Sequence, residues 1–425
     1  MVLIRILIKT IFFLFLFISS ALSSRILDYE TEDFLKKIKD LILSVNDYDK
    51  PINISIILDQ NPNALVNEKE EIIITSGLIT ESPDYISLLT VLAHEIGHLE
   101  KKHIIKRKNS IKNLQSINQL GNLAIIAGSI ISQNPDVVTA LAMNQVGINN
   151  YYLSYSKEQE READYYAMNT LKKLNLPSKS IIKFLNKLEK NSINKGINED
   201  FQKFTTHPIF KERYEIMMEN EIVNSYKKYN QLNIRFNFIK AKFLAYTSEK
   251  NIVNKLNNPY KKYYESISSS KKGNLKKSLK KINELIVSNK NNIYLIETKA
   301  DILLSFGYNK EAVKFYKKVV KVLPHNQYAK IRIFNNINLN NLSNLELNTL
   351  FKNNLELLFN FPSNKNIELK YIDLVYILNK IEWIEFFELY QNVDMMKREF
   401  YKKEMKIIYN KTDDKYLKKL IKLKS

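Results

Sequence analysis

The chain has 425 residues and a formal net charge of +20, with no cysteine and only five histidines. Its composition, 45% hydrophobic and 26% charged, is that of a globular protein, and the length suggests roughly two or three domains. Without cysteine it can form no disulfide, iron–sulfur cluster or cysteine-ligated zinc finger, so His, Asp or Glu must hold any metal. Lysines are spread along the whole sequence, which favours a solvated basic surface and argues against nucleic acid as a partner.

The N-terminal segment has the pattern of a secretory signal peptide. Arg5 and Lys9 precede an apolar run over residues 11–18, and small residues follow up to Ser23. We therefore expect residues 1–23 to be a cleaved signal peptide and the mature chain to reside in a bacterial periplasm. The alternative is an uncleaved segment that anchors the protein to the inner membrane, although the apolar run is shorter than the ~20 residues of a membrane helix.

The next elements predict a small sheet followed by a long helix. An amphipathic helix within residues 26–48 precedes two strand-like runs, 54–58 and 71–75. A helix-capping pattern that begins at Ser82 then predicts a helix running to about His103.

Residues 120–131 are almost all apolar or small, but they are too few to span a bilayer. We expect a buried helix or a lid that dips into a surface there. A capping box at Ser156 predicts the start of a further helix.

From about residue 228 the sequence has long helical periodicity and an internal repeat. Gly273 and Gly307 are 34 residues apart, and each precedes a small residue by five positions and a large one by nine. The second copy has the spacing of a tetratricopeptide repeat at Ala300, Leu303, Gly307, Ala312, Tyr316 and Pro324. We expect an all-α, TPR-like domain over residues 228–425; the alternative is an ordinary helical hairpin with accidental glycines.

The sequence His94-Glu95-Ile96-Gly97-His98 carries the strongest chemical signal. At about 100° per residue, His94 and His98 lie one turn apart on the same helix face and can bind one metal ion. Glu95 is rotated away from that face, which leaves its carboxylate free to act on a water molecule beside the metal. Zn²⁺ held by neutral nitrogens activates water at neutral pH, and an adjacent carboxylate can then take the proton as a general base.

A catalytic zinc needs a third protein ligand, and the helix that begins at Ser156 offers one. Glu160 and Asp164 share a face of that helix, and Ala163 and Ala167 are small enough to let another helix approach closely. We assign Glu160 as the third ligand. Asp164 would accept a hydrogen bond from the outer nitrogen of a ligand histidine. Other acidic residues of this helix, including Glu162, are expected on a solvated face.

Together, the two metal-site segments resemble the gluzincin metalloprotease family that includes the CaaX prenyl protease. The resemblance is carried by His94–His98 and Glu160–Asp164, and it covers roughly residues 26–225. The signal peptide and the 34-residue repeats are similar to the periplasmic, repeat-bearing BepA-type branch of that family. One departure is Lys157, where the family usually has Arg after the serine.

A further segment resembles the substrate-binding edge strand of that family. It comprises Asn63 and Ala64 followed by the run Ile72, Ile73 and Ile74. We therefore expect an extended polypeptide to add as a strand beside Ile72–Ile74, with main-chain hydrogen bonds giving affinity and little sequence selectivity.

Thr206-His207-Pro208 with Arg213 resembles the downstream His-Pro element of the same family. His207 could stabilise the transition state through a hydrogen bond to the oxyanion, or occupy the fourth zinc position and keep the enzyme latent. A purely structural histidine is the third reading. Arg213 is expected to be a buried ion-pair partner. His103 is expected on the opposite helix face from His94, so it is no ligand candidate, and neither is His325.

These features predict a mainly α protein: a signal peptide (1–23), an α+β zinc metallopeptidase domain with a small edge-exposed sheet (24–227), and a TPR-like domain (228–425). We expect an exported endopeptidase with one Zn²⁺ that cleaves unfolded or misassembled envelope proteins, with residues 104–150 forming a mobile wall over the cleft. By resemblance, its partners would be outer-membrane proteins and their assembly machinery, with peripheral membrane contact also possible. The alternatives are a chaperone or adaptor with a latent protease, and a membrane-anchored processing protease.

Overall fold

The structure is a computed structural model, which describes residues 25–67, 69–105, 155–194, 207, 211–219, 230–247, 253, 256–362, 364–393, 396 and 398–425. The chain divides into two compact units, Met1–Leu256 and Asn257–Ser425. The expected signal peptide (1–23) and the apolar stretch 120–131 lie outside the described residues, as does nearly all of the expected wall.

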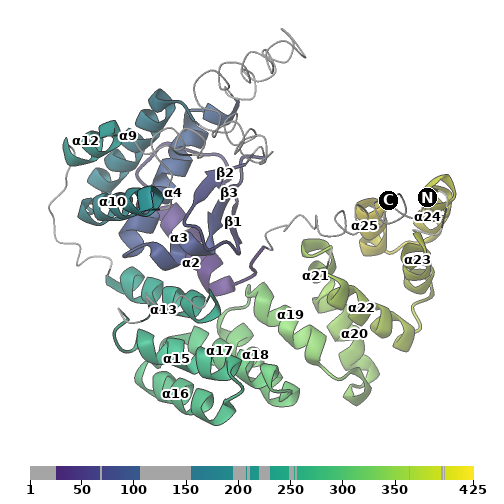
Figure 1. Cartoon of the computed structure of the whole chain (residues 1–425). Coiled ribbons are helices and arrows are strands. Elements are labelled where there is room, and N and C mark those ends of the chain that lie inside the picture. Colours follow the sequence, from purple (N-terminus) through teal and green to yellow (C-terminus); the bar gives the residue numbers. More distant parts are fainter. Residues whose placement is uncertain are drawn as a thin grey trace, which may run out of the picture. The chain divides into compact units, whose positions relative to one another are not determined.

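The first unit combines a three-stranded sheet with helices (Figure 1). Its strands are β1 (Ile54–Ile57), β2 (Ala64–Val66) and β3 (Ile72–Thr75). Its described helices are α2 (Tyr29–Leu43), α3 (Ser76–Glu81), α4 (Tyr85–Glu100), α9 (Lys157–Leu174), α10 (Lys179–Asn194), α12 (Lys211–Glu219) and α13 (Asn230–Thr247). The prediction of a mainly α protein whose first domain also contains a small sheet is confirmed.

β3 is the central strand of the sheet. It pairs in parallel with β1 and antiparallel with β2. Both backbone edges of β3 are therefore occupied, so a substrate strand cannot add beside Ile72–Ile74, and that prediction is wrong. Short apolar runs fit any strand order, which is why the sequence did not show which strand lies at the edge. Arg25 and Ile26 pair with the far edge of β1, and among the described residues no strand pairs with the far edge of β2.

Helix α4 begins two residues later than the capping pattern predicts. The Asp84 carboxylate, not the Ser82 hydroxyl, caps the helix by accepting a hydrogen bond from the backbone N–H of Ser87. Ser82 instead ends α3, where its hydroxyl donates to the carbonyl of Leu78. The helix also ends earlier, at Glu100, because Lys102 adopts a left-handed backbone conformation with φ of 55°.

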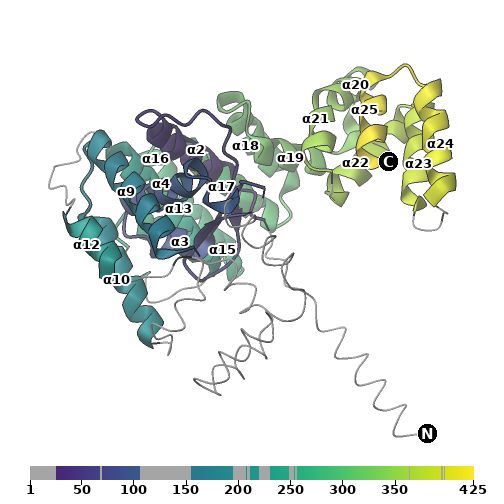
Figure 2. The ribbon, with the colours of Figure 1, turned by 90° about the horizontal axis from the view of Figure 1, so that it is seen from above.

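Helix α4 lies at the centre of the first unit, and most of its side chains are buried. Helix α9 packs along it through the small residues Gly97 and Ala163. Helix α12 packs against α9 and lies beside α10 (Figures 1 and 2). The site described below is built on these helices, so its side chains have rigid supports.

Helix α13 also belongs to the first unit, although the sequence places the domain boundary at 227/228, just before it. Its Phe236 and Ile239 lie in the core cluster of that unit. The Lys240 ammonium donates to the carbonyl of Ser82 at 2.6 Å, and the Lys242 ammonium lies 2.7 Å from carboxylate oxygens of both Asp28 and Glu30. The contacts divide the chain after Leu256.

The described residues of the second unit form helices joined by short connections, with no strand among them. They are α15 (Tyr260–Lys271), α16 (Leu275–Ser288), α17 (Ile293–Ser305), α18 (Asn309–Val322), α19 (Gln327–Asn336), α20 (Asn344–Asn353), α21 (Leu355–Asn360), α22 (Lys365–Ile377), α23 (Ile381–Gln391), α24 (Arg398–Lys411) and α25 (Lys415–Lys424), with a 3₁₀ turn at Leu339–Asn341.

The two repeat glycines form the turns of successive hairpins, α15–α16 and α17–α18. Gly273 and Gly307 have φ of +77° and +80°, a conformation that favours glycine. Around the second turn, the residues that define the repeat form one hydrophobic cluster, which includes Ala300, Ala312 and Tyr316. The tetratricopeptide assignment itself stays a prediction.

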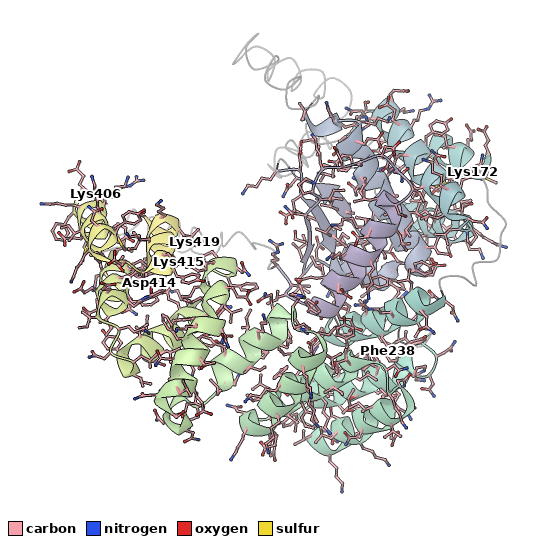
Figure 3. The ribbon with its side chains drawn as sticks, turned by 180° about the vertical axis from the view of Figure 1, so that it is seen from behind. Lys172, Phe238, Lys406, Asp414, Lys415 and Lys419 are labelled. Carbon is pink, nitrogen blue, oxygen red and sulfur yellow. The ribbon has the colours of Figure 1, made fainter. Side chains whose placement is uncertain are left out.

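Lysines dominate the surface of the last two helices. Lys406, Lys415 and Lys419 are exposed on α24 and α25 (Figure 3). Among the described residues, no helix combines the length and the apolar character needed to cross a membrane.

Candidate metal centre

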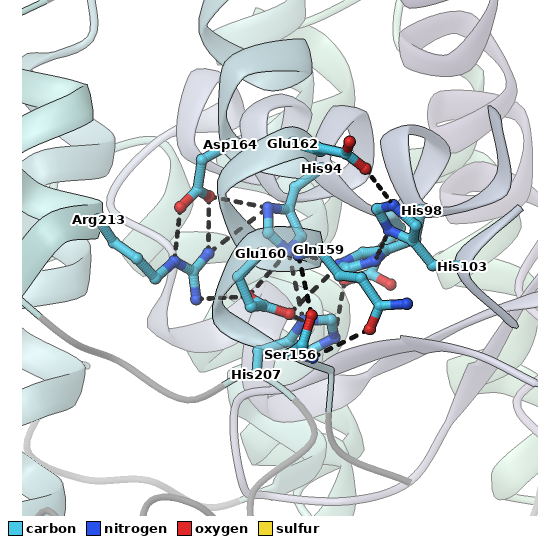
Figure 4. A network of polar contacts seen from close by, with 11 residues as sticks. His94, His98, His103, Ser156, Gln159, Glu160, Glu162, Asp164, His207 and Arg213 are labelled. Atoms are coloured by element: carbon cyan, nitrogen blue, oxygen red, sulfur yellow. Dashed lines mark hydrogen bonds and ion pairs between the residues drawn. The ribbon is translucent and has the colours of Figure 1, made fainter. Parts of the chain in front are cut away.

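Four side chains converge beside α4 and α9 (Figure 4). The Nε2 atoms of His94 and His98 are 3.0 Å apart, and Glu160 Oε1 lies 3.4 Å from His98 Nε2. His207 contributes its Nδ1 atom, which lies 2.9 Å from Glu160 Oε1 and 3.3 Å from His94 Nε2. One ligand atom from each of the four residues lies within 4.8 Å of the other three. The structure thus brings together the three predicted ligands and His207.

This group of donors fits a zinc ion. With Zn–N bonds of about 2.0–2.1 Å, the ligand atoms of a tetrahedral site are roughly 3.3 Å apart, close to the separations found here. Glu160 is fully buried, with Oε1 directed at the imidazoles of His98 and His207 and Oε2 paired with Arg213. Two imidazoles and a carboxylate are donor types that Zn²⁺ takes in proteins. Zinc would be held by His94, His98 and Glu160.

The outer nitrogen of His94 is fixed by a buried carboxylate. His94 Nδ1 lies 2.9 Å from Asp164 Oδ1. Asp164 in turn accepts two hydrogen bonds from Arg213, at 2.7 Å from Nε and 2.8 Å from Nη2. Arg213 also lies 3.0 Å from Glu160 Oε2 through Nη1. The predicted contact between Asp164 and a ligand histidine, and the predicted ion pair of Arg213, are both present.

These charges set the protonation of the site when no metal is bound. Burial lowers the pKa of His94, but the carboxylates of Glu160 and Asp164 outweigh it and raise that pKa to about 9. Burial raises the pKa of Asp164, yet the Arg213 guanidinium brings it below its usual range. Burial holds the pKa of His98 well below its usual range. At neutral pH the metal-free site therefore holds His94 as a charged imidazolium and His98 as a neutral imidazole.

The surroundings of His98 differ from what the sequence predicts. His103 is fully buried, and its Nδ1 atom lies 2.9 Å from Nδ1 of His98. The prediction that His103 faces away is wrong, because α4 ends at Glu100 and the turn at Lys102 brings the chain back. Glu162 is partly exposed, in line with the expected solvated face, but its Oε2 atom also lies 2.7 Å from His103 Nε2.

Tyr155 is a further site residue that sequence reasoning missed. It is buried, and its ring stacks on the His98 imidazole with 3.7 Å between centroids. It lies just before the capping box of α9, and nothing in the local sequence distinguishes it from the many other tyrosines. Its position follows from the way α9 packs along α4.

Glu95 lies beside the ligands without joining them. Its side chain is 1% exposed, and Oε1 is 3.2 Å from Nε2 of His207. Its other oxygen, Oε2, has no hydrogen-bond partner among the described residues. A buried carboxylate with an unused acceptor next to a metal site is suited to accept a proton from water.

Comparison with known proteins is in agreement with this geometry. Residues 29–220 match the profile of peptidase family M48. The chain is 26% identical over 151 residues to the putative beta-barrel assembly-enhancing protease of Vibrio cholerae serotype O1. The matched residues make up 35% of this chain and 30% of the relative. It is 22% identical over 169 residues to the beta-barrel assembly-enhancing protease of Yersinia pestis, covering 40% and 34% of the two chains.

The corresponding protein of Escherichia coli K12 is 23% identical over 148 residues, which cover 35% of this chain and 30% of the relative. The chain therefore spans about a third of the length of the curated relatives that it matches.

Proposed function

Residues 29–220 match the profile of peptidase family M48, and from this premise we propose that the protein is an exported, zinc-dependent endopeptidase that cleaves unfolded or misassembled envelope proteins. The observation that carries the proposal is the convergence of His94, His98 and Glu160 on one point, with the carboxylate of Glu95 beside them. A purely structural cluster would not require the buried Oε2 atom of Glu95, which has no hydrogen-bond partner among the described residues.

The roles of the individual residues follow from their positions. Zinc, when bound, polarises the scissile carbonyl and activates water for attack on it. Glu95 takes the proton of the attacking water and delivers it to the leaving amine, as a general base and then a general acid. Asp164, itself held by two hydrogen bonds from Arg213, keeps Nε2 of His94 directed at the metal.

The free edge of β2 is the best-supported place for the substrate. Asn63 accepts a backbone hydrogen bond from Thr75 of β3, and Asn67 donates one to Glu71, just before β3. Because hydrogen bonding alternates along an antiparallel strand, Leu65 also faces β3, whereas Ala64 and Val66 direct their N–H and C=O groups to the other side. β2 packs against α4, which carries Glu95. An extended polypeptide that pairs with this edge would be bound through its main chain, largely regardless of sequence.

The biological context of the proposal comes from the relatives. They are named beta-barrel assembly-enhancing proteases, which supports outer-membrane proteins as substrates and the outer-membrane assembly machinery as a partner. The helical second unit, with its TPR-like repeat, would dock that partner. Export would depend on the proposed signal peptide, and a mature N-terminus at Ser24 in the secreted fraction would support it.

A second candidate, a binding protein whose protease is latent, is favoured by His207. Its Nδ1 atom lies among the zinc ligand atoms, where a fourth ligand would exclude water. In that case most of the cellular role would depend on the second unit, and Glu95→Gln would leave it largely intact.

The deciding experiment is cleavage of an unfolded model protein by purified mature protein, comparing wild type with Glu95→Gln and measuring zinc in both. Cleavage by wild type alone, with equal zinc content, is the expected result. Zinc without cleavage in either protein would favour latency, and His207→Ala should then restore activity. If neither protein binds zinc, the proposed function is wrong.

A further inference from the structure

The two zinc-binding histidines have very different partners at their outer nitrogens. His94 contacts the buried carboxylate of Asp164 directly. His98 contacts another imidazole instead: its Nδ1 atom lies 2.9 Å from Nδ1 of His103. His103 is fully buried, and its Nε2 atom lies 2.7 Å from Oε2 of Glu162 (Figure 4). The contacts form a continuous chain from the metal site through His98 and His103 to Glu162.

The positions of the protons in this chain follow from the metal. Nε2 of His98 faces the ligand group, so it must offer its lone pair there, and the proton of this neutral imidazole must sit on Nδ1. That N–H can be satisfied only if Nδ1 of His103 is a bare acceptor, since two N–H groups 2.9 Å apart would repel. His103 must then carry its own proton on Nε2, where the Glu162 carboxylate accepts it at 2.7 Å.

We propose that His103 is a positioning residue that selects the metal-binding tautomer of His98, and that Glu162 selects the tautomer of His103. The proposal rests on the proposed zinc site. It gives His98 a support analogous to the one that Asp164 gives His94, but relayed through a neutral ring. Tyr155 stacks on the same imidazole and holds its plane, so that hydrogen bonding and stacking together fix the direction of His98 Nε2.

The chain of contacts from His98 through His103 ends at Glu162, near solvent. The carboxylate that contacts His94, that of Asp164, is buried. The Glu162 side chain is 40% exposed, whereas the Asp164 side chain is fully buried. Water can replace a carboxylate at an exposed position and cannot do so at a buried one. Loss of Glu162 should therefore weaken zinc binding less than loss of His103.

The test is the zinc affinity of the full mature chain, measured by competition with a chelating dye. His103→Leu should weaken zinc binding about 10–100-fold, the range found when a hydrogen-bond partner of a ligand histidine is removed. His103→Gln offers an amide oxygen as acceptor and should stay within about threefold of wild type. Glu162→Leu should weaken binding by a smaller factor than His103→Leu, and Glu162→Gln should be close to wild type.

Two matched controls separate this effect from general damage. His325→Leu removes an exposed histidine of the second unit, and Glu158→Gln removes an exposed acid from the first turn of α9. Both should bind zinc as wild type does. The melting temperature of each metal-free variant shows whether it folds.

A spectroscopic readout tests the tautomers independently of activity. The chain has five histidines, so selective ¹⁵N labelling of histidine gives a spectrum that single substitutions can assign. In the zinc-loaded protein, His103 should be protonated on Nε2 and His98 on Nδ1. Three results would each overturn the proposal. The first is unchanged zinc affinity in a folded His103→Leu variant, and the second is a loss of zinc affinity in His103→Gln as large as that in His103→Leu. The third is a proton on Nδ1 of His103 in the zinc-loaded protein. Zinc-loaded wild type that fails to cleave would contradict the proposed function alone, because none of these readouts uses cleavage.

Discussion

Gly97 of α4 lies against the backbone of Ala163 on α9, at a separation that is too tight for a Cβ atom unless α9 shifts by a few tenths of an ångström. A Cβ atom on Gly97 would lie 3.2 Å from Cα of Ala163 and 3.1 Å from Cβ of Tyr166. Gly97 directly precedes His98, and Ala163 lies one turn from Glu160 on α9. The close approach of the two helices is therefore what allows a ligand on α9 to reach the ligands on α4.

Gly97→Ala tests this relationship. In an exposed helix the change would stabilise the protein by about 0.5–1 kcal/mol. Here the added methyl group can be accommodated only by a small shift of the packed α9 backbone, so we expect a net destabilisation of about 1–2 kcal/mol, measured by urea unfolding, and weaker zinc binding. Gly273→Ala is the control: it forces a left-handed conformation with nothing within 4 Å of the new Cβ, and it should destabilise the second unit without altering zinc affinity. Normal zinc affinity in Gly97→Ala would show that the helix spacing is not critical.

The raised pKa of His94 predicts a strong pH dependence of zinc binding. Because this pKa is about 9 in the metal-free site, zinc must displace one proton from His94 at neutral pH. The apparent dissociation constant should fall about tenfold per pH unit from pH ~6.5 to ~8.5, instead of levelling off near the ordinary histidine pKa. Calorimetry in buffers of different ionisation enthalpy should record the release of about one proton. Asp164→Asn should flatten the upper part of this profile, since it removes a charge that raises the pKa of His94.

The raised pKa of His94 also affects the stability of the metal-free chain. This stability falls as the pH rises, whereas the affinity for zinc increases. The proton on His94 stabilises the metal-free fold fully below pH 6.5, and this contribution is lost as the pH rises through about 9. The melting temperature of the metal-free chain should fall over that interval. Saturating zinc should abolish the fall, because the metal takes the place of the proton. A metal-free chain whose melting temperature is flat from pH 6.5 to 9 would contradict the assignment.

The ion pair between Arg213 and Asp164 should behave as a buried unit. Arg213→Met leaves the carboxylates of Asp164 and Glu160 without their cation, and we expect a loss of about 3–5 kcal/mol in the free energy of unfolding. Adding Asp164→Asn should recover part of this loss, which a double-mutant cycle on metal-free protein would measure. Additive effects of the two substitutions would mean that the pair is not coupled.

The free edge of β2 can be tested with two proline substitutions. Val66→Pro removes an N–H group that we expect to face the substrate, and it should lower kcat/KM for an unfolded substrate at least about fivefold, the equivalent of one hydrogen bond. Leu65→Pro removes an N–H group that faces β3, so it should lower the melting temperature instead. Unchanged kcat/KM in a folded Val66→Pro variant would exclude strand addition at β2.

Lys242 of α13 should offset part of the cost of burying the Glu30 carboxyl group. Glu30 is 1% exposed; burial raises its pKa, and the ammonium of Lys242, 2.7 Å away, opposes this. Lys242→Met should cost about 3 kcal/mol at pH 7. An acid with a raised pKa destabilises the fold only as the pH rises above about 4.5, so the deficit should be smaller at pH 4.5 than at pH 7. Glu30→Gln in the same background should restore much of the stability at pH 7.

The sequence alone was enough to pick out the residues of the candidate metal centre and the broad class of the fold. His94 and His98 are one helical turn apart, and that spacing places two imidazoles on one face whatever the helix packs against. The same local rule placed Glu160 and Asp164 together. Periodicity also predicted that the C-terminal half is helical. The preference of glycine for a left-handed backbone predicted turns at the two repeat glycines. Both are local properties of the sequence.

Only the tertiary structure decided which groups support the ligands and where a substrate strand can bind. The reversal at Lys102 that returns His103 to His98 occurs at a non-glycine residue in a lysine pair, so no sequence signal marks it. Glu162 then meets His103 because α9 lies along α4. In the same way, the order of the strands, with β3 at the centre, depends on contacts between segments and not on the composition of any one of them. Burial and pairing of this kind are long-range, and a local pattern carries no information about them.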